Sequence, residues 1–119
     1  MILTVIDTET TGVSLHKHEL LEVAFVSYVV LESGERLITK KYQTKIKPKY
    51  IFSASPKALE INGYTAEAWR DAPFAKEVLP EICSALSKSS VMVGQNLIFD
   101  LNIFSKSCTD NNIDLPSYP

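Results

Sequence analysis

The sequence has few cysteines, and none of them lies in a metal-binding motif. Its two cysteines, Cys83 and Cys108, are far apart among 119 residues and have no CxxC spacing and no nearby histidine. This spacing argues against a structural zinc site and against a disulfide scaffold. Both cysteines lie in apolar segments with helical patterning, so we expect them to be buried, reduced thiols.

Long hydrophobic runs are also absent. No stretch is apolar over the ~18 residues that a membrane-spanning helix requires. The N-terminus passes from Ile2–Ile6 directly into polar residues, without the cationic flank and small-residue cleavage site of a signal peptide. We therefore expect no membrane association and a reducing, cytoplasmic setting.

The chain lacks a strong charge of either sign. Its 12 Lys and Arg residues nearly balance 14 Asp and Glu residues, which leaves a net charge of −2. A nucleic-acid-binding function therefore cannot be argued from bulk electrostatics, although a nuclease that holds phosphate through metal ions needs no basic field. The 45% hydrophobic and 22% charged composition is typical of a folded globular protein. The length suits one domain over residues 1–119.

The first half of the chain has strand patterning. A glycine-containing turn at Glu32–Glu35 joins the second and third strands into a hairpin. The second strand is apolar on both faces, so we expect it to be covered on both sides. The third is rich in lysine, which is typical of a strand near a sheet edge. The three strands are expected at residues 2–6, 19–31 and 36–46.

Helices dominate the second half. Ser55 and Pro56 predict the start of a short helix that Asn62-Gly63 ends. A longer helix is expected from Asp71 to about Lys88, with a kink or a fresh start at Pro80. A strand at residues 90–94 and a helix from Phe99 to about Asn111 follow. This order predicts an α/β fold with a mixed sheet flanked by helices.

Two acidic residues, Asp7 and Glu9, stand at the end of the first strand. Residues at positions i and i+2 of a strand face the same side, so both carboxylates can approach one point. Their repulsion is relieved by a divalent cation, and oxygen ligands favour Mg²⁺ or Mn²⁺. The same pattern is also common on solvated strand ends. Gly12 allows a close turn, where Thr10 and Thr11 could donate to a sugar or phosphate or simply face solvent.

A third carboxylate, Asp100, follows the fourth strand at the start of a helix. If that strand lies beside the first, Asp100 faces Asp7 and Glu9. An acid at this position is also favoured by the helix dipole alone. Three carboxylates from two elements are what two-metal hydrolysis of a phosphodiester requires.

Two segments carry a family resemblance. Asp7-Thr8-Glu9-Thr10-Thr11-Gly12 resembles the first motif of DnaQ-like exonucleases, the DEDD superfamily with an RNase H-like fold. The segment from Gly94-Gln95-Asn96 to Phe99-Asp100 resembles their second motif, usually Gly-His-Asn-x-x-Phe-Asp. The segments between them, Leu21–Ala24, Ile61–Thr65 and Asp71–Phe74, also resemble the family. Gln95 and Asn62 stand where the family often has histidine.

The resemblance implies a 3′–5′ exonuclease that acts on single-stranded 3′ ends of DNA or RNA, with a polymerase as a conceivable partner. It assigns metal binding to Asp7, Glu9 and Asp100, with two Mg²⁺ (or Mn²⁺) ions in the complete site and Asp7 bridging both. It assigns substrate contacts to six residues, of which Phe99 is equally typical of a core aromatic. These six are Thr10, Thr11, Gly12, Val13, Asn96 and Phe99.

The family's third motif, which carries the last metal-binding aspartate and a histidine or tyrosine, is not found before Pro119. Asp110 and Asp114 are too close behind Asp100 and lack its context. We therefore expect an exonuclease domain that is incomplete at its C-terminus. Such a chain should be weakly active or inactive alone.

Several residues and functions remain outside this scheme. His16 and His18 lie in the loop after the first motif and are expected in solvent, whereas Glu22 is expected to have a structural hydrogen-bonding role. One alternative is a haloacid-dehalogenase-type phosphatase, although Glu9 replaces the second aspartate of its motif. Another is an exonuclease fold that serves as a non-catalytic binding module.

Overall fold

The computed structural model describes residues 1–119 as a four-stranded mixed sheet with helices. The strand order is β3-β2-β1-β4, in which β1 pairs antiparallel with β2, and β2 with β3, while β4 lies parallel to β1. The predicted hairpin and the edge position of the lysine-rich strand are confirmed. The strands are β1 (Ile2–Thr10), β2 (Leu20–Val30), β3 (Arg36–Lys45) and β4 (Val91–Val93).

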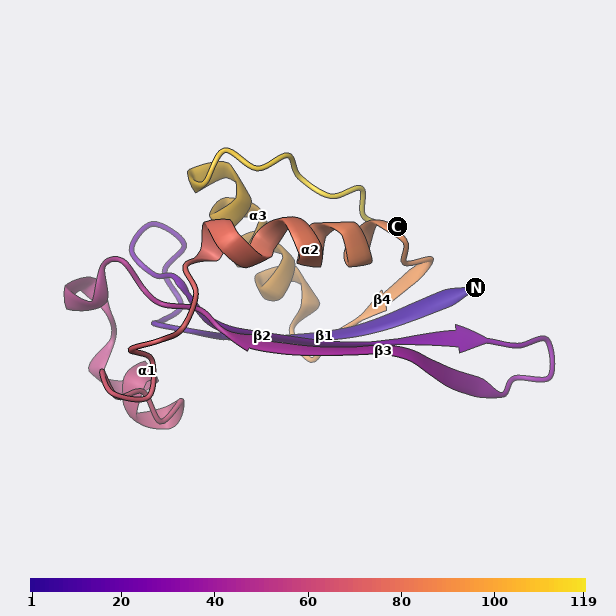
Figure 1. The fold of residues 1–119 in the computed structure, drawn as a ribbon, viewed down its shortest axis with the longest axis horizontal. Helices are drawn as coiled ribbons and strands as arrows, with labels where there is room; N and C mark the ends of the chain where they lie inside the picture. The colour runs from indigo at the N-terminus through magenta and orange to yellow at the C-terminus, as the bar shows by residue number, and fades with distance from the viewer.

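Two helices, α2 (Ala75–Ser87) and α3 (Leu97–Asp110), lie over one face of the sheet (Figure 1). Every second residue of β1 and β2 points toward them, and those positions are apolar or small enough to pack. This layer of side chains excludes water and forms the core. Its buried members include Ile6, Val23, Phe25, Leu79, Ile82, Leu86, Ile103 and Phe104.

The opposite face of the sheet is open, so the prediction of cover on both sides of the second strand was wrong. Val5, Val91 and Val93 are 39, 38 and 43% exposed there. The short elements η1 (Ile51–Ser53) and α1 (Pro56–Ile61) lie beyond the strand ends rather than over this face (Figure 1).

The helix boundaries differ from the predicted ones in physically clear ways. Helix α2 begins at Ala75 rather than Asp71, because Glu77 Oε2 accepts the Phe74 N–H at 2.7 Å and caps the helix there. Pro80 does not interrupt α2, since the side chains around it are held in the core. Helix α3 begins two residues before Phe99. None of the helices is long and apolar enough to span a membrane.

Both cysteines are buried, as predicted, where α2 packs against α3. Their Sγ atoms are 3.5 Å apart, and burial raises the pKa of the Cys108 thiol to about 12. Because only the thiolate reacts, we expect the native chain to react with Ellman's reagent at least ~100-fold more slowly than the chain in guanidinium. Titration of both samples at pH 8 checks this; rapid reaction of both thiols in the native chain would contradict the packing.

Candidate active site

The first carboxylates, Asp7 and Glu9, lie on the open face near the end of β1. Asp7 is opposite Ala24 of β2, and Glu9 is opposite Glu22. Asp7 is exposed and Glu9 is half-buried, while Thr8 between them points toward the helices and is buried. The two carboxylates therefore share one side of the strand, as their spacing predicts.

Asp100 is brought to the same region by β4 and α3. Its side chain is 5% exposed, and Oδ1 accepts a hydrogen bond from Thr8 Oγ1. Gly94 allows this approach, since a Cβ atom there would lie 3.3 Å from the Ile6 carbonyl oxygen and 3.4 Å from Asp100 Oδ2. The predicted placement of the fourth strand beside the first is confirmed.

Burial and mutual repulsion raise the pKa values of two of the three carboxyl groups. The pKa of Glu9 is raised, first by burial and then by Asp7, Glu22 and Asp100. The pKa of Asp100 is raised by burial and by Asp7, and hydrogen bonding with Thr8 partly offsets this. Burial is therefore the largest cause of both raised pKa values, and neighbouring carboxylates add to it.

These residues fit a hard divalent cation by their donor chemistry, because carboxylate oxygens are the ligands that Mg²⁺ and Mn²⁺ prefer. Their side chains do not converge on one point in this structure. No group of three or more His, Cys, Asp or Glu side chains is arranged to hold a metal ion. Asp100 bonds to Thr8, whose side chain points to the helix side of β1, whereas Asp7 and Glu9 lie on the open side. A cation would relieve the part of the raised pKa values of Glu9 and Asp100 that comes from neighbouring carboxylates.

The hydroxyls of Thr10 and Thr11 hold the loop after β1. Thr10 Oγ1 donates to the Gly12 carbonyl oxygen at 2.7 Å, and Thr11 Oγ1 accepts the Glu19 N–H at 2.9 Å. Both side chains are buried. In this structure the hydroxyls shape the loop, and their contact with a sugar or phosphate stays a prediction.

His18 is 9% exposed, so its predicted position in solvent was wrong. Its ring packs against Gly12, where an added Cβ would lie 2.3 Å from ring atoms. The Ser14 N–H donates to His18 Nδ1 at 2.9 Å. A polar loop gives no periodicity that could reveal such a buried ring. His16, in contrast, is exposed as expected.

The region around α1 also supports the loop. The Asn62 side chain donates to the Thr10 carbonyl oxygen at 2.9 Å, and the Ser55 N–H donates to that of Thr11 at 2.8 Å. In the sequence, Ser55 carried a helix-start signal, and Asn62 a helix-end signal and a position where the family often has histidine, so these contacts were not predicted. The two bonds fix the backbone of Thr10 and Thr11, which leads into Gly12 and Val13.

The remaining predicted site residues differ in exposure. Val13 is 85% exposed, which leaves its apolar side chain free to meet a ligand. Asn96 is exposed at the start of α3, whereas Phe99 is half-buried and packs against the core. Glu22 accepts a hydrogen bond from Gln43 Nε2 at 2.9 Å, which confirms its expected hydrogen-bonding role.

Comparison with protein families finds one match over almost the whole chain. Residues 4–116 match the RNase T family, which is described as exonuclease. This match contains both sequence motifs and the strands and helices that place them. It favours the exonuclease interpretation over the phosphatase alternative.

Curated relatives and solved structures agree with the family match. A PolC-type DNA polymerase III of Thermotoga maritima is 35% identical over 81% of this chain but only 6% of its own length. The DNA polymerase III subunit epsilon of Aquifex aeolicus is 31% identical over 86% of this chain and 46% of its own. E. coli Exonuclease I in complex with a dT13 oligonucleotide has a TM-score of 0.78 at 18% identity, over 95% of this chain and 24% of that one. The last likeness confirms the fold, and the chain spans less than half of each relative.

Proposed function

The chain belongs to the RNase T family of exonucleases, and on that premise we propose that it removes nucleotides from the 3′ end of a nucleic acid strand by metal-dependent hydrolysis. The observation that carries the proposal is that β1 and α3 place Asp7, Glu9 and Asp100 in one region, where burial first and the charge of Asp7 second raise the pKa of Glu9 and Asp100. Carboxylates that repel one another at the end of a strand are suited to bind a cation.

We assign metal binding to Asp7, Glu9 and Asp100, which would hold divalent ions. Such ions would supply an activated water and stabilise the departing oxygen of the phosphodiester. Thr8 acts as a positioning residue, because its hydroxyl holds Asp100 Oδ1. The donor set favours Mg²⁺ or Mn²⁺ over softer metals.

The 3′-terminal nucleotide is assigned to the loop from Thr10 to Val13. The loop is fixed by hydrogen bonds to Asn62, Ser55 and Glu19, so it offers a preorganised surface. The exposed Val13 side chain would contact the base, and Asn96 and Phe99 would border the scissile end. Single-stranded 3′ ends are the proposed substrate, and a polymerase is the proposed partner, in keeping with the names of the relatives.

The 119 residues should hydrolyse a strand slowly or not at all by themselves. The family's third motif, with its last aspartate and its catalytic histidine or tyrosine, is not among them. Loss of a catalytic base alone typically lowers a rate by ~10²–10⁴-fold. Slow hydrolysis is therefore compatible with the proposed site.

The test is incubation of the chain with a 5′-labelled single strand and Mn²⁺, followed over hours. We expect a faint ladder of products shortened from the 3′ end, which Asp7→Ala abolishes. Asp71→Ala is the matched control, because it removes an exposed carboxylate far along the sequence and should leave the ladder unchanged.

Three results would contradict parts of the proposal. Release of the 5′ label as a mononucleotide would contradict the polarity, and internal cleavage would contradict exonuclease action. Rapid, complete degradation would contradict the expected weakness of the 119 residues. A ladder that persists in Asp7→Ala would remove the assigned role of that carboxylate.

A further inference from the structure

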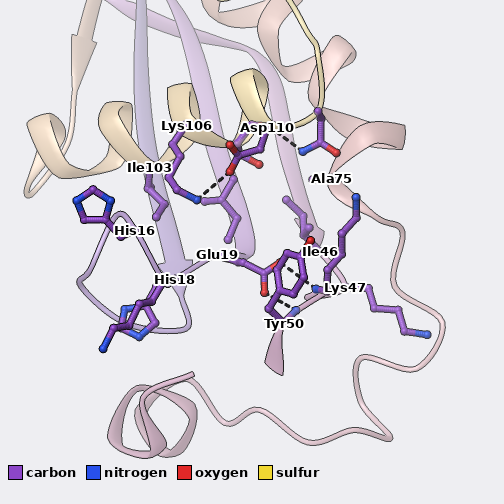
Figure 2. Close-up of a pocket in the computed structure, with 15 residues that line it drawn as sticks. His16, His18, Glu19, Ile46, Lys47, Tyr50, Ala75, Ile103, Lys106 and Asp110 are labelled. Atoms are coloured by element: carbon purple, nitrogen blue, oxygen red, sulfur yellow. Dashed lines mark hydrogen bonds and ion pairs between the residues drawn. The ribbon is translucent and has the colours of Figure 1, made fainter. Parts of the chain in front are cut away.

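A cavity of about 490 Å³ lies between the C-terminal half of α3, the loop after β1 and the segment after β3. Figure 2 shows His16 and His18 on one side, Lys106 and Asp110 above, and Lys47 and Tyr50 below. Lysine and histidine supply most of its polar wall. We call it the basic cavity and define it by Lys17, Lys47, Lys49, Lys106, His16 and His18.

Most of the lysine charges in the basic cavity have no acidic partner. Lys106 pairs with Asp110 at 2.8 Å, and Lys47 Nζ donates to the Arg70 carbonyl oxygen at 3.1 Å. Lys17, Lys47 and Lys49 form no ion pair. Because Lys47 Nζ is held by Arg70 beside the Phe74 ring, the free ammonium groups of the wall are those of Lys17 and Lys49. These two positive charges at one hollow favour an anion there, although the whole chain carries a net charge of −2.

The one other acid in the wall, Glu19, does not neutralise these lysines. Its two carboxylate oxygens accept the backbone N–H groups of Lys49 and Tyr50, both at 2.9 Å. Glu19 therefore fixes the segment that carries Lys49. Its role is to position a lysine rather than to cancel its charge.

Glu19 also connects the basic cavity to the loop assigned to the 3′-terminal nucleotide. Its N–H donates to Thr11 Oγ1, and its carbonyl oxygen accepts the Thr11 N–H, each at 2.9 Å. On the other side of the loop, the ring of His18 packs against Gly12. The wall of the cavity and the loop are thus one hydrogen-bonded unit.

We propose that the basic cavity binds phosphate groups of the same nucleic acid strand whose 3′ end lies at the Thr10–Val13 loop. This proposal rests on the proposed function for the identity of the strand. A strand carries one negative charge per phosphodiester, so several of its phosphates can pair with several lysines. Release of counterions then contributes to affinity. A free mononucleotide offers the same phosphate chemistry, and its binding must be compared.

The test measures binding without hydrolysis. Fluorescence anisotropy of a short 5′-fluorescein-labelled oligothymidylate is recorded with the 119-residue chain in EDTA, at several salt concentrations. The cavity variant is Lys17→Ala/Lys49→Ala. The matched control is Lys41→Ala/Lys88→Ala, which removes the same charge from two exposed lysines outside the cavity and without ion pairs.

We expect the cavity variant to bind about 10-fold more weakly at low salt, and its slope of log K against log salt to fall by about 1.4 for two lost phosphate contacts. The control should change by less than ~2-fold. Equal losses in both variants, or none in the cavity variant, would overturn the proposal. So would dTMP that competes as tightly as the oligothymidylate, because the site would then belong to a free nucleotide.

Because EDTA removes divalent cations, the result does not depend on catalysis. If the chain shows no metal-dependent hydrolysis but binds the oligonucleotide through these lysines, the proposed function is contradicted and the proposed phosphate site is not. Circular dichroism of both double variants confirms that they fold, which is expected because all four lysines are exposed.

Discussion

Asparagine in place of Asp100 is expected to raise the thermal unfolding midpoint of the metal-free chain, although it removes a carboxylate of the candidate site. Burial and Asp7 raise the pKa of the Asp100 carboxyl group, so its ionised form costs stability in the folded chain. Asparagine fills the same space and can still accept the Thr8 hydroxyl. Relief of about 1 kcal/mol corresponds to ~4–8 °C in a domain of this size class.

The effect has a defined dependence on pH. The folded chain binds the Asp100 proton more tightly than the unfolded chain does. In the unfolded chain this carboxyl group has its ordinary pKa of 3.8. The wild-type chain therefore loses this part of its stability as pH rises through the raised pKa, and regains it on acidification. The advantage of Asp100→Asn should grow as pH rises through the raised pKa of Asp100 and shrink as pH falls toward 3.8.

Calorimetry in EDTA at several pH values measures both features. Asp110→Asn is the matched control, because it makes the same change near the end of α3 and only removes an exposed pair with Lys106. The control should leave the midpoint unchanged or slightly lower. A midpoint of Asp100→Asn at or below that of the wild type at pH 7 would show that burial of the Asp100 carboxylate beside Asp7 does not cost stability.

Alanine in place of Gly12 is expected to destabilise the chain strongly. Gly12 has φ of +157°, and an added Cβ would lie 2.3 Å from the His18 ring. Strain and overpacking together should lower the free energy of unfolding by about 3 kcal/mol. At the same ~4–8 °C per kcal/mol, the corresponding fall in thermal midpoint is ~12–24 °C.

A double variant separates the clash from other effects. His18→Ala alone should destabilise, since it removes the acceptor of the Ser14 N–H. In Gly12→Ala/His18→Ala the two losses should be less than additive, because the ring that clashes is gone. Gly34→Ala is the control: it has φ of +86° but open space around it, so only backbone strain of about 1–2 kcal/mol is expected. Additive losses would show that the ring and Gly12 are not in contact.

The sheet, and the strand and helix that carry the candidate carboxylates, were predictable because their signals are local. Three local features predicted which strands lie side by side. They are the apolar run before Asp7, the spacing of Asp7 and Glu9, and the second motif before Asp100. The structure confirms that β4 lies beside β1. The Ser55-Pro56 helix start was also correct, because a cap residue and proline act within one turn.

The rest depends on contacts between distant segments. The burial of His18 follows from its fit against Gly12, which polar loop sequence does not encode. The uncovered face beside Val5 could not be recognised from apolar strands, because they have the same composition whether a second layer is present or not. The basic cavity joins α3 to residues near the start of β2 and the end of β3, which only the fold brings together.

Binding of Mn²⁺ to the chain tests the central claim most directly, because it does not require a complete catalytic apparatus. Free Mn²⁺ is followed by electron paramagnetic resonance during titration of the wild-type chain, Asp7→Asn, and the control Asp71→Asn. The account predicts saturable binding by the wild type and the control, and its loss in Asp7→Asn. Equal binding by all three chains would contradict the assignment of the metal site to these carboxylates.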